Sequence, residues 1–293
     1  MTQSWVDLPC YLNGHLGRLG DARVPVMDRG FLFGDGVYET IPVHGRRLFR
    51  VDDHLDRLGR SLKALRIEDP YEREAWLDLL RSLVAHLPDV EDQTIYLQVT
   101  RGVAARGHAM PADIEPTVLA YTQPLIALSP EQRHQGLSCV TARDFRWQRG
   151  DIKSTSLLGN VLARQVAVDQ GADEVVLIRD GFVTEGSSSN VWIVRDGALL
   201  TPPPGESLLE GVRVRVLKEL CEELGIACNL RPIAETELPT ADEILLTSAS
   251  KEVAPVTRLD HEPVGHGALR GKPGPVYAKL YEAYQRAKAL QSL

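Results

Sequence analysis

The sequence of 293 residues contains little cysteine and has no long apolar run. Its cysteines are scattered, and no two of them have the C-x-x-C spacing of a redox motif or zinc site, which argues against a disulfide framework. No apolar run approaches the ~20 residues that a membrane span requires. The first ten residues, MTQSWVDLPC, lack the basic and apolar regions of a signal peptide. We therefore expect a protein of the reducing cytoplasm without a membrane partner.

The chain also lacks an excess of basic charge. Its 33 Lys and Arg residues stand against 40 Asp and Glu residues, so the formal net charge is −7. This sign argues against nucleic acid as a main partner, although it is compatible with a local basic pocket. The eight histidines do not cluster like metal ligands. In HEPVGH the spacing is one residue too long for H-E-x-x-H, and Pro263 and Gly265 would break the helix of that motif. We expect no metal site.

The composition is that of a globular protein, with 43% hydrophobic and 25% charged residues, and the length suits two domains. Strand and helix patterns are mixed in both halves, which indicates two α+β or mixed α/β domains. The segment TQPLIALSPEQ carries two prolines between two patterned regions. We therefore predict a small N-terminal domain at 1–121, a linker at 122–130 and a larger C-terminal domain at 131–293.

The helical periodicity is clearest in four segments. Leucines recur at helical spacing in 52–67, a second helix is predicted over 72–87, and a third over 157–171. A fourth helix is expected to begin near Gly211 and to end at Gly225. The segment 31–49, FLFGDGVYETIPVHGRRLF, is expected to be loop and strand. Three hairpins are predicted, one at the Asn-Gly of CYLNGHLG and two at the RDG sequences of 174–186 and 190–203.

Lys153 lies in RWQRGDIKSTSLLGN, where a strand is expected to give way to a helix. A lysine amine is protonated at neutral pH, with a reference pKa of ~10.4. In a partly desolvated place it loses that proton more easily and condenses with an aldehyde as a Schiff base. A solvated surface lysine is the alternative for this residue taken alone.

Four other features supply the partners that such a lysine needs. Glu185, before three serines, could face a pyridine nitrogen and keep it protonated. The helix start at Gly211 offers backbone N–H groups to a phosphate. The strand end LLTSASKEV could close over the same phosphate, and Arg57 has donors that fit it. Each has a plain structural alternative, but together they are the components of a pyridoxal-phosphate site.

With these motifs in order along the chain, the sequence resembles the class IV aminotransferases, the fold type IV group of pyridoxal-phosphate enzymes. The resemblance runs from YLNG to TSASKEV and includes RGFLFGDGVYET, DHLDRL, DIKS…LLGNVLARQ, TEGSSSN and LLEGVRVRVL. It implies a two-domain fold type IV enzyme, pyridoxal 5'-phosphate as cofactor, and a homodimer.

The resemblance also implies roles for individual residues. Lys153 would form the internal aldimine and move the proton between the substrate Cα and C4′ of the cofactor, and Glu185 would pair with the ring nitrogen. The other expected cofactor contacts are Arg57, the backbone of Val212 and Arg213, and the turn Ser248, Ala249, Ser250 at the phosphate, with Leu209 on the ring face, Arg146 at the ring hydroxyl, and Ser188 and Ser189 at the side. Because Ala249 has no hydroxyl, phosphate binding would depend more on backbone donors and Arg57.

The segment TRGVAARGHAMP is similar to the Arg-x-His sequence of D-amino-acid transaminases. The resemblance implies that Arg106, His108 and Tyr38 receive the substrate α-carboxylate, with His54 beside them. We therefore expect an aminotransferase that acts on D-amino acids and 2-oxo acids by a ping-pong cycle.

Three alternatives stay open. Two are enzymes of the same group, a branched-chain L-amino-acid aminotransferase and an aminodeoxychorismate lyase, which would release pyruvate without an amino acceptor. The third is a small-molecule-binding α/β protein in which Lys153 does no chemistry.

Overall fold

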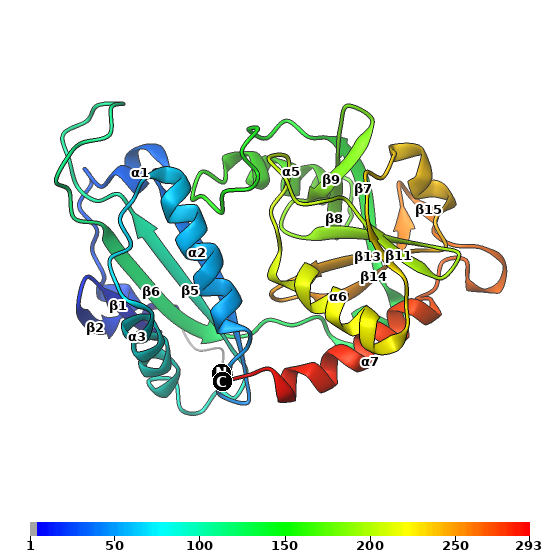
Figure 1. The fold of residues 1–293 in the computed structure, drawn as a ribbon, viewed down its shortest axis with the longest axis horizontal. Helices are drawn as coiled ribbons and strands as arrows, with labels where there is room; N and C mark the ends of the chain where they lie inside the picture. The colour runs from blue at the N-terminus through cyan, green and yellow to red at the C-terminus, as the bar shows by residue number, and fades with distance from the viewer. Residues whose placement is uncertain (1–4) are drawn as a thin grey trace. The chain divides into compact units, whose positions relative to one another are not determined.

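The computed structural model describes residues 5–293, and they form two compact units. The first comprises the described residues up to Ile126 together with Ile152–Leu157 and Lys288–Leu293. The second comprises Ala127–Asp151 and Leu158–Ala287. Each unit combines helices with a β-sheet (Figure 1), so the predicted mixed α/β class is confirmed.

The first unit contains an antiparallel sheet of six strands in the order β2-β1-β6-β5-β3-β4. Its elements are η1 (Trp5–Asp7), β1 (Pro9–Leu12), β2 (His15–Arg18), η2 (Leu19–Asp21), α1 (Arg29–Phe33), β3 (Gly36–His44), β4 (Arg47–Leu48), α2 (Val51–Leu65), α3 (Arg73–Ala85), β5 (Gln93–Thr100) and β6 (Thr117–Pro124).

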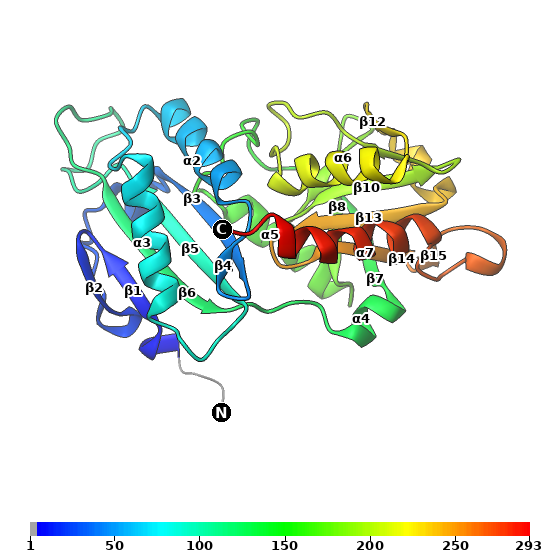
Figure 2. The ribbon, with the colours of Figure 1, turned by 60° about the horizontal axis from the view of Figure 1, so that its bottom comes forward.

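Alternation along strand β3 gives this sheet two chemically different faces. Val37, Ile41 and Val43 share one core with apolar residues of α2 and α3, which pack on that face (Figure 2). Tyr38 and Thr40 alternate with them and so point to the other face. The helix face therefore supplies the core, and the other face is left for polar and aromatic side chains.

The second unit contains a mixed sheet of nine strands with the main order β12-β11-β10-β13-β14-β7-β8-β9, and β15 pairs with β14. Its elements are α4 (Pro130–Gln135), β7 (Leu137–Arg143), α5 (Leu158–Asp169), β8 (Glu174–Arg179), β9 (Phe182–Gly186), β10 (Asn190–Arg195), β11 (Ala198–Thr201), α6 (Val212–Leu224), β12 (Cys228–Leu230), η3 (Glu235–Thr240), β13 (Glu243–Ser248), β14 (Glu252–Leu259), β15 (Glu262–Pro263), η4 (Gly267–Leu269) and α7 (Pro275–Leu290), whose last residues belong to the first unit.

Helices α6 and α7 lie side by side in this unit (Figure 2), where the Arg213 side chain donates to the Tyr284 hydroxyl at 3.2 Å. Helix α5 packs on strands β7 and β8 through Ala163 and Ala167, and the small alanine side chains allow a close approach. Within residues 5–293 no helix is long and apolar enough to cross a membrane. The same residues contain no cluster of metal-ligating side chains.

The long helices and the hairpins follow their sequence patterns. The four predicted helices are α2, α3, α5 and α6, and the last of them ends at Gly225 in the left-handed conformation, with φ of 65°. The three hairpin turns place Asn13, Asp180 and Asp196 at positive φ, each followed by a glycine at positive φ. These predictions are confirmed.

Two expectations need correction. Residues 31–33, expected as loop or strand, complete the short helix α1. Lys153 is not at a strand end. Strand β7 stops at Arg143, and Lys153 lies in an extended segment that, with the last six residues of the chain, packs in the first unit. The domain boundaries as functional limits stay a prediction.

Candidate active site

Lys153 is held against strand β3 by main-chain contacts. The Tyr38 N–H donates to the Lys153 carbonyl at 3.0 Å, and Ser154 forms an isolated bridge with Val37. The Lys153 N–H donates to the Ser61 hydroxyl at 3.3 Å. The half-buried side chain places its Nζ 4.2 Å from the centroid of the Tyr38 ring. The main chain of Lys153 is therefore fixed, and the side-chain amine lies beside an aromatic ring.

Tyr38 begins a row of three stacked tyrosines on the face of the sheet opposite α2 and α3. Its ring centroid is 5.6 Å from that of Tyr96, which is 5.2 Å from that of Tyr121. Burial raises the pKa of Tyr96, and the neighbouring tyrosines raise it further. Tyr96 consequently stays neutral at ordinary pH, and the three rings form an aromatic wall next to Lys153.

Glu39 points to the other face of β3 and meets two of the predicted site residues on α2. Arg57 donates to Glu39 through Nε and Nη2, both at 2.7 Å, and His54 Nδ1 lies 2.7 Å from Oε2 of the same carboxylate. Burial raises the pKa of Glu39, but the charge and hydrogen bonds of Arg57 and His54 outweigh it and leave the pKa well below its usual range. Glu39 thus orients Arg57 and His54, a role that sequence reasoning missed.

Arg106 and His108 come together on the ring of Phe33. The Arg106 guanidinium carbon lies 5.5 Å from the ring centroid, and the His108 and Phe33 centroids are 5.7 Å apart. Both side chains belong to exposed residues of the loop between β5 and β6. Their described contacts are with Phe33, whereas Tyr38 contacts Tyr96 and Lys153. The predicted pairing of Arg106 with His108 has a structural basis, and their joint action with Tyr38 stays a prediction.

In the second unit, Glu185 and Arg146 form a buried ion pair. Arg146 also donates to both carboxylate oxygens of Asp144, each at 2.9 Å, and the Leu209 N–H donates to Glu185 Oε2 at 3.1 Å. Burial lowers the pKa of Arg146, but Asp144 and Glu185 outweigh this and raise it. The unit therefore contains a buried carboxylate whose direction is fixed by Arg146 and the Leu209 N–H.

The serines after Glu185 surround a second buried carboxylate, Glu174. Ser187 donates to it through its hydroxyl and its N–H, and the hydroxyls of Ser188 and Ser189 lie 3.5 and 3.3 Å from Oε2. Lys251 Nζ lies 3.1 Å from the same oxygen. Burial raises the pKa of Glu174, but Lys251 and the donors outweigh it and lower the pKa. Ser188 and Ser189 are thus tied to Glu174, which sequence reasoning also missed, because one buried glutamate at a strand start has no sequence signature.

The start of helix α6, at Gly211, lies in close contact with Asn190 and has no side-chain cap. A Cβ at Gly211 would lie 2.0 Å from Asn190 Oδ1, and the Asn190 amide donates to the Leu209 carbonyl at 2.9 Å. The first-turn N–H groups, among them those of Val212 and Arg213, give this end a partial positive charge. In the turn that follows β13, the Lys251 N–H donates to the Ser248 hydroxyl at 3.1 Å, which closes the turn around Ala249 and Ser250.

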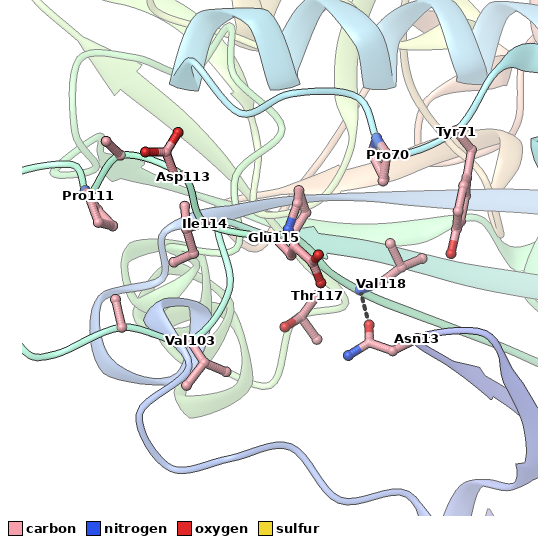
Figure 3. Close-up of a pocket in the computed structure, with 13 residues that line it drawn as sticks. Asn13, Pro70, Tyr71, Val103, Pro111, Asp113, Ile114, Glu115, Thr117 and Val118 are labelled. Carbon is pink, nitrogen blue, oxygen red and sulfur yellow. Dashed lines mark hydrogen bonds between the residues drawn. The ribbon is translucent and has the colours of Figure 1, made fainter.

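A pocket of about 550 Å³ in the first unit does not contain these groups (Figure 3). Residues 111–118 line one part of it, and Asn13 and Tyr71 line another. The side chain of Asn13 points to the Val118 N–H and accepts a hydrogen bond from it at 2.7 Å. Since Lys153, Arg57 and Tyr38 do not line this pocket, it is not the candidate site.

The chain is similar to known aminotransferases over most of its length. The family model of amino-transferase class IV matches residues 36–259. A D-alanine aminotransferase of Bacillus licheniformis is 41% identical over 276 residues, which cover 94% of this chain and 95% of the relative. The branched-chain amino acid aminotransferase of Escherichia coli superposes with a TM-score of 0.88 at 26% identity, covering 96% and 94%. The branched-chain aminotransferase of the archaeon Thermoproteus uzoniensis, solved with norvaline, gives 0.85 at 25% identity, covering 96% and 95%.

Proposed function

Because the chain belongs to the class IV aminotransferase family, we propose that it transfers amino groups between D-amino acids and 2-oxo acids in a ping-pong cycle. One observation carries the choice of substrate. The identity is 41% with a D-alanine aminotransferase but 26% with a branched-chain enzyme of the same fold type IV architecture. The branched-chain alternative therefore has support from the shared fold, and the D-amino-acid function has support along the whole sequence.

The residues present fit pyridoxal 5'-phosphate, the cofactor of this family. Glu185 is a buried carboxylate beside a guanidinium, and such a group can hold a ring nitrogen in its protonated form. The start of α6 has N–H donors and the positive end of the helix dipole, which suit a phosphate. Lys153 supplies an amine with a fixed main chain. We assign these three groups to the cofactor, with Arg57 and the turn Ser248–Ala249–Ser250 as further phosphate contacts.

When bound, the cofactor supplies an electron-accepting ring that stabilises negative charge at the substrate Cα. With the cofactor bound, Lys153 Nζ would accept the proton that leaves Cα and deliver it to C4′, and the second half of the cycle would run this transfer in the opposite direction. Arg106 and His108 orient the substrate through its α-carboxylate, and Tyr38 and His54 complete this group. The ring would be held in place by Arg146, Leu209, Ser188 and Ser189. Glu185 would keep a proton on the ring nitrogen, which would preserve the electron sink.

The deciding experiment is an activity panel. The purified enzyme is supplied with D- or L-alanine, glutamate or leucine and with pyruvate or 2-oxoglutarate as acceptor. We expect turnover with the D-enantiomers of alanine and glutamate. A preference for L-leucine would replace this proposal with the branched-chain function, and release of pyruvate from aminodeoxychorismate without an acceptor would replace it with the lyase function.

Lys153 is expected to be the residue that binds the cofactor covalently. Borohydride reduction of the wild-type enzyme, followed by peptide mass mapping, should place the pyridoxyl group on Lys153. The Lys153→Ala variant should still bind the cofactor, lose turnover and show no reducible adduct. An adduct on Lys63, Lys218 or Lys251 would overturn the assignment.

We also propose that the protein is a cytoplasmic homodimer. Helix α5 exposes an apolar row at helical spacing, with Leu158 72%, Val161 61%, Leu162 51% and Val168 50% exposed. Such a row on a globular protein is typical of an interface. Charged substitutions, Val161→Glu with Leu162→Lys, should halve the mass measured by light scattering, whereas Val24→Glu on another exposed segment should not.

The four cysteines are free thiols, which suits a reducing compartment.

A further inference from the structure

Helix α1 and the GDG sequence after it have no role in the proposed chemistry, yet they are firmly fixed. The residue that caps the start of the helix is Asp28, whose side chain accepts from the Gly30 N–H at 2.8 Å. It ends at Gly34 in the left-handed conformation, where a Cβ would lie 2.5 Å from the Ser156 hydroxyl. Capping at both ends holds this five-residue helix in a single place.

Asp35, in the centre of GDG, joins two buried arginines. Arg29 Nε donates to it at 2.7 Å, and Arg101 donates through Nε at 2.8 Å and Nη2 at 3.0 Å. Burial raises the pKa of Asp35, but the two guanidinium groups outweigh it and lower the pKa. The ionised carboxylate fixes the direction of the Arg29 guanidinium, which is almost fully buried.

Arg29 directs a second nitrogen to the substrate-binding loop. Its Nη1 donates to the Gly107 carbonyl at 2.7 Å, and Gly107 is the residue between Arg106 and His108. The Arg29 N–H also donates to the Gly102 carbonyl at 2.9 Å, at the start of the same loop. The loop is thus tied to α1 near its start and at its functional centre.

Phe33 provides the surface on which the two loop side chains rest. The guanidinium carbons of Arg29 and Arg106 lie 4.9 and 5.5 Å from its ring centroid, and the His108 centroid lies 5.7 Å away. Exposed arginine and histidine side chains otherwise keep much of their rotamer freedom, and binding would have to remove it. One aromatic ring that contacts both reduces that cost in advance.

We propose that Arg29, Phe33 and Asp35 are positioning residues that pre-organise Arg106 and His108 for the substrate carboxylate, an inference that rests on the proposed function. Phe33 aligns the two side chains by cation–π and ring contacts. Arg29 fixes the main chain between them, and Asp35 holds Arg29. None of the three touches the reacting atoms.

The test compares Phe33→Leu, Phe33→Tyr and Arg29→Lys with wild type, with Phe182→Leu as a matched control in the other unit. Four quantities are measured for each: KM and kcat for D-alanine, the inhibition constant of propionate against D-alanine, and the dissociation constant of pyridoxal phosphate. Propionate carries the carboxylate but no amine, so its inhibition constant reports on the carboxylate site alone. Arg106→Ala serves as the reference for full loss, about 10- to 150-fold in kcat/KM.

Phe33→Leu and Arg29→Lys should raise the KM for D-alanine and the propionate constant together, by about 3- to 30-fold. They should leave kcat and cofactor affinity within about twofold of wild type. Phe33→Tyr retains the ring and should stay within about twofold throughout, as should Phe182→Leu.

An unchanged propionate constant in Phe33→Leu and Arg29→Lys would overturn the inference. So would an equal loss of cofactor affinity, since a merely structural role would affect every ligand alike. A wild-type enzyme without D-alanine turnover would instead refute the proposed function itself, and the two failures are therefore distinguishable.

Discussion

At the residue scale, buried carboxylates that no sequence motif predicts hold the polar side chains around them in place. Glu39, Glu174 and Asp144 are each nearly inaccessible to solvent, and each gathers charged or hydroxyl donors. A buried charge is tolerated only when it is paired and hydrogen-bonded, so these groups hold their partners in fixed directions. The predicted site residues Arg57, Ser189 and Arg146 are among those partners.

The Glu39 cluster should make stability depend on pH. The pKa of Glu39 is lower in the folded state than in the unfolded chain, so its stabilising contribution is present above the unfolded value of ~4.3 and is lost as the pH falls below it. Glu39→Gln leaves Arg57 and His54 without this charge and should cost about 3–5 kcal/mol at pH 7. Urea unfolding between pH 3 and 7 would show it.

The free energy of unfolding of Glu39→Gln should also fall less than that of wild type as the pH is lowered from 7 to 3. The exposed Glu91→Gln variant is the control and should match wild type at each pH. If Glu39→Gln were as stable as wild type at pH 7, the cluster of Glu39, Arg57 and His54 would not stabilise the fold.

At the element scale, prediction from sequence succeeds where a repeating pattern is long. Helix α2 has four leucines at helical spacing, and the hairpins have turn residues that tolerate positive φ. Helix α1 has five residues, too few for a period, and its start depends on a cap that only the fold confirms. The two prolines at 124 and 130 lie at the end of β6 and at the start of α4, so the predicted linker at 122–130 overlaps the ends of both elements, and its role as a linker stays a prediction.

The sequence predicts members of the candidate site as residues, but it does not predict their contacts. Lys153, Glu185 and the α6 start were predicted because each matches a motif. Phe33, Arg29 and Glu39 were not, because an aromatic residue, an arginine and a glutamate in a strand-rich stretch have ordinary packing roles in most proteins. Their partners lie far along the chain, since Arg29 and Gly107 are 78 positions apart.

A substitution at Gly211 tests whether the start of helix α6 binds the phosphate of the cofactor. Gly211→Ala would place a Cβ 2.0 Å from Asn190 Oδ1, displacing the amide that holds the Leu209 carbonyl. We expect pyridoxal phosphate to bind about 3- to 30-fold more weakly, while phosphate-free pyridoxal binds nearly as before, because the helix start addresses only the phosphate.

Gly59→Ala is the matched control, since Gly59 lies inside helix α2 with nothing within 4 Å of the added carbon. That change should stabilise the protein by about 0.5–1 kcal/mol and leave both affinities unchanged. Equal weakening of both ligands by Gly211→Ala would contradict a phosphate role for the helix start.

At the scale of the whole molecule, the end of the described chain pairs with the edge of the first sheet. Leu48 and Leu293 exchange two backbone hydrogen bonds of 2.7 and 2.8 Å, and Ser292 bridges to Phe49. Deleting residues 288–293 removes these bonds and uncovers the edge of β4. Each lost bond costs about 0.5–1.5 kcal/mol, so the melting temperature should fall by several degrees.

The matched control for this deletion is Leu290→Ala, which shortens an 83% exposed side chain but keeps the backbone pairing. It should melt close to wild type when both variants are followed by calorimetry. A deletion variant with an unchanged melting temperature would show that the edge pairing does not stabilise the first unit.

The division of the chain has a consequence for synthesis. Neither unit is one continuous stretch, because the polypeptide leaves the first unit after Ile126, returns at Ile152, leaves again after Leu157 and returns at Lys288. A ribosome that has released only the first 126 residues has therefore not released a complete unit. The segment with Lys153 and the backbone partner of Leu48 emerge later. The first unit to begin emerging is thus completed only after residues 158–287 of the second unit have emerged, and a chain that stops just before residue 288 has all six strands of the sheet but lacks the segment that pairs with Leu48.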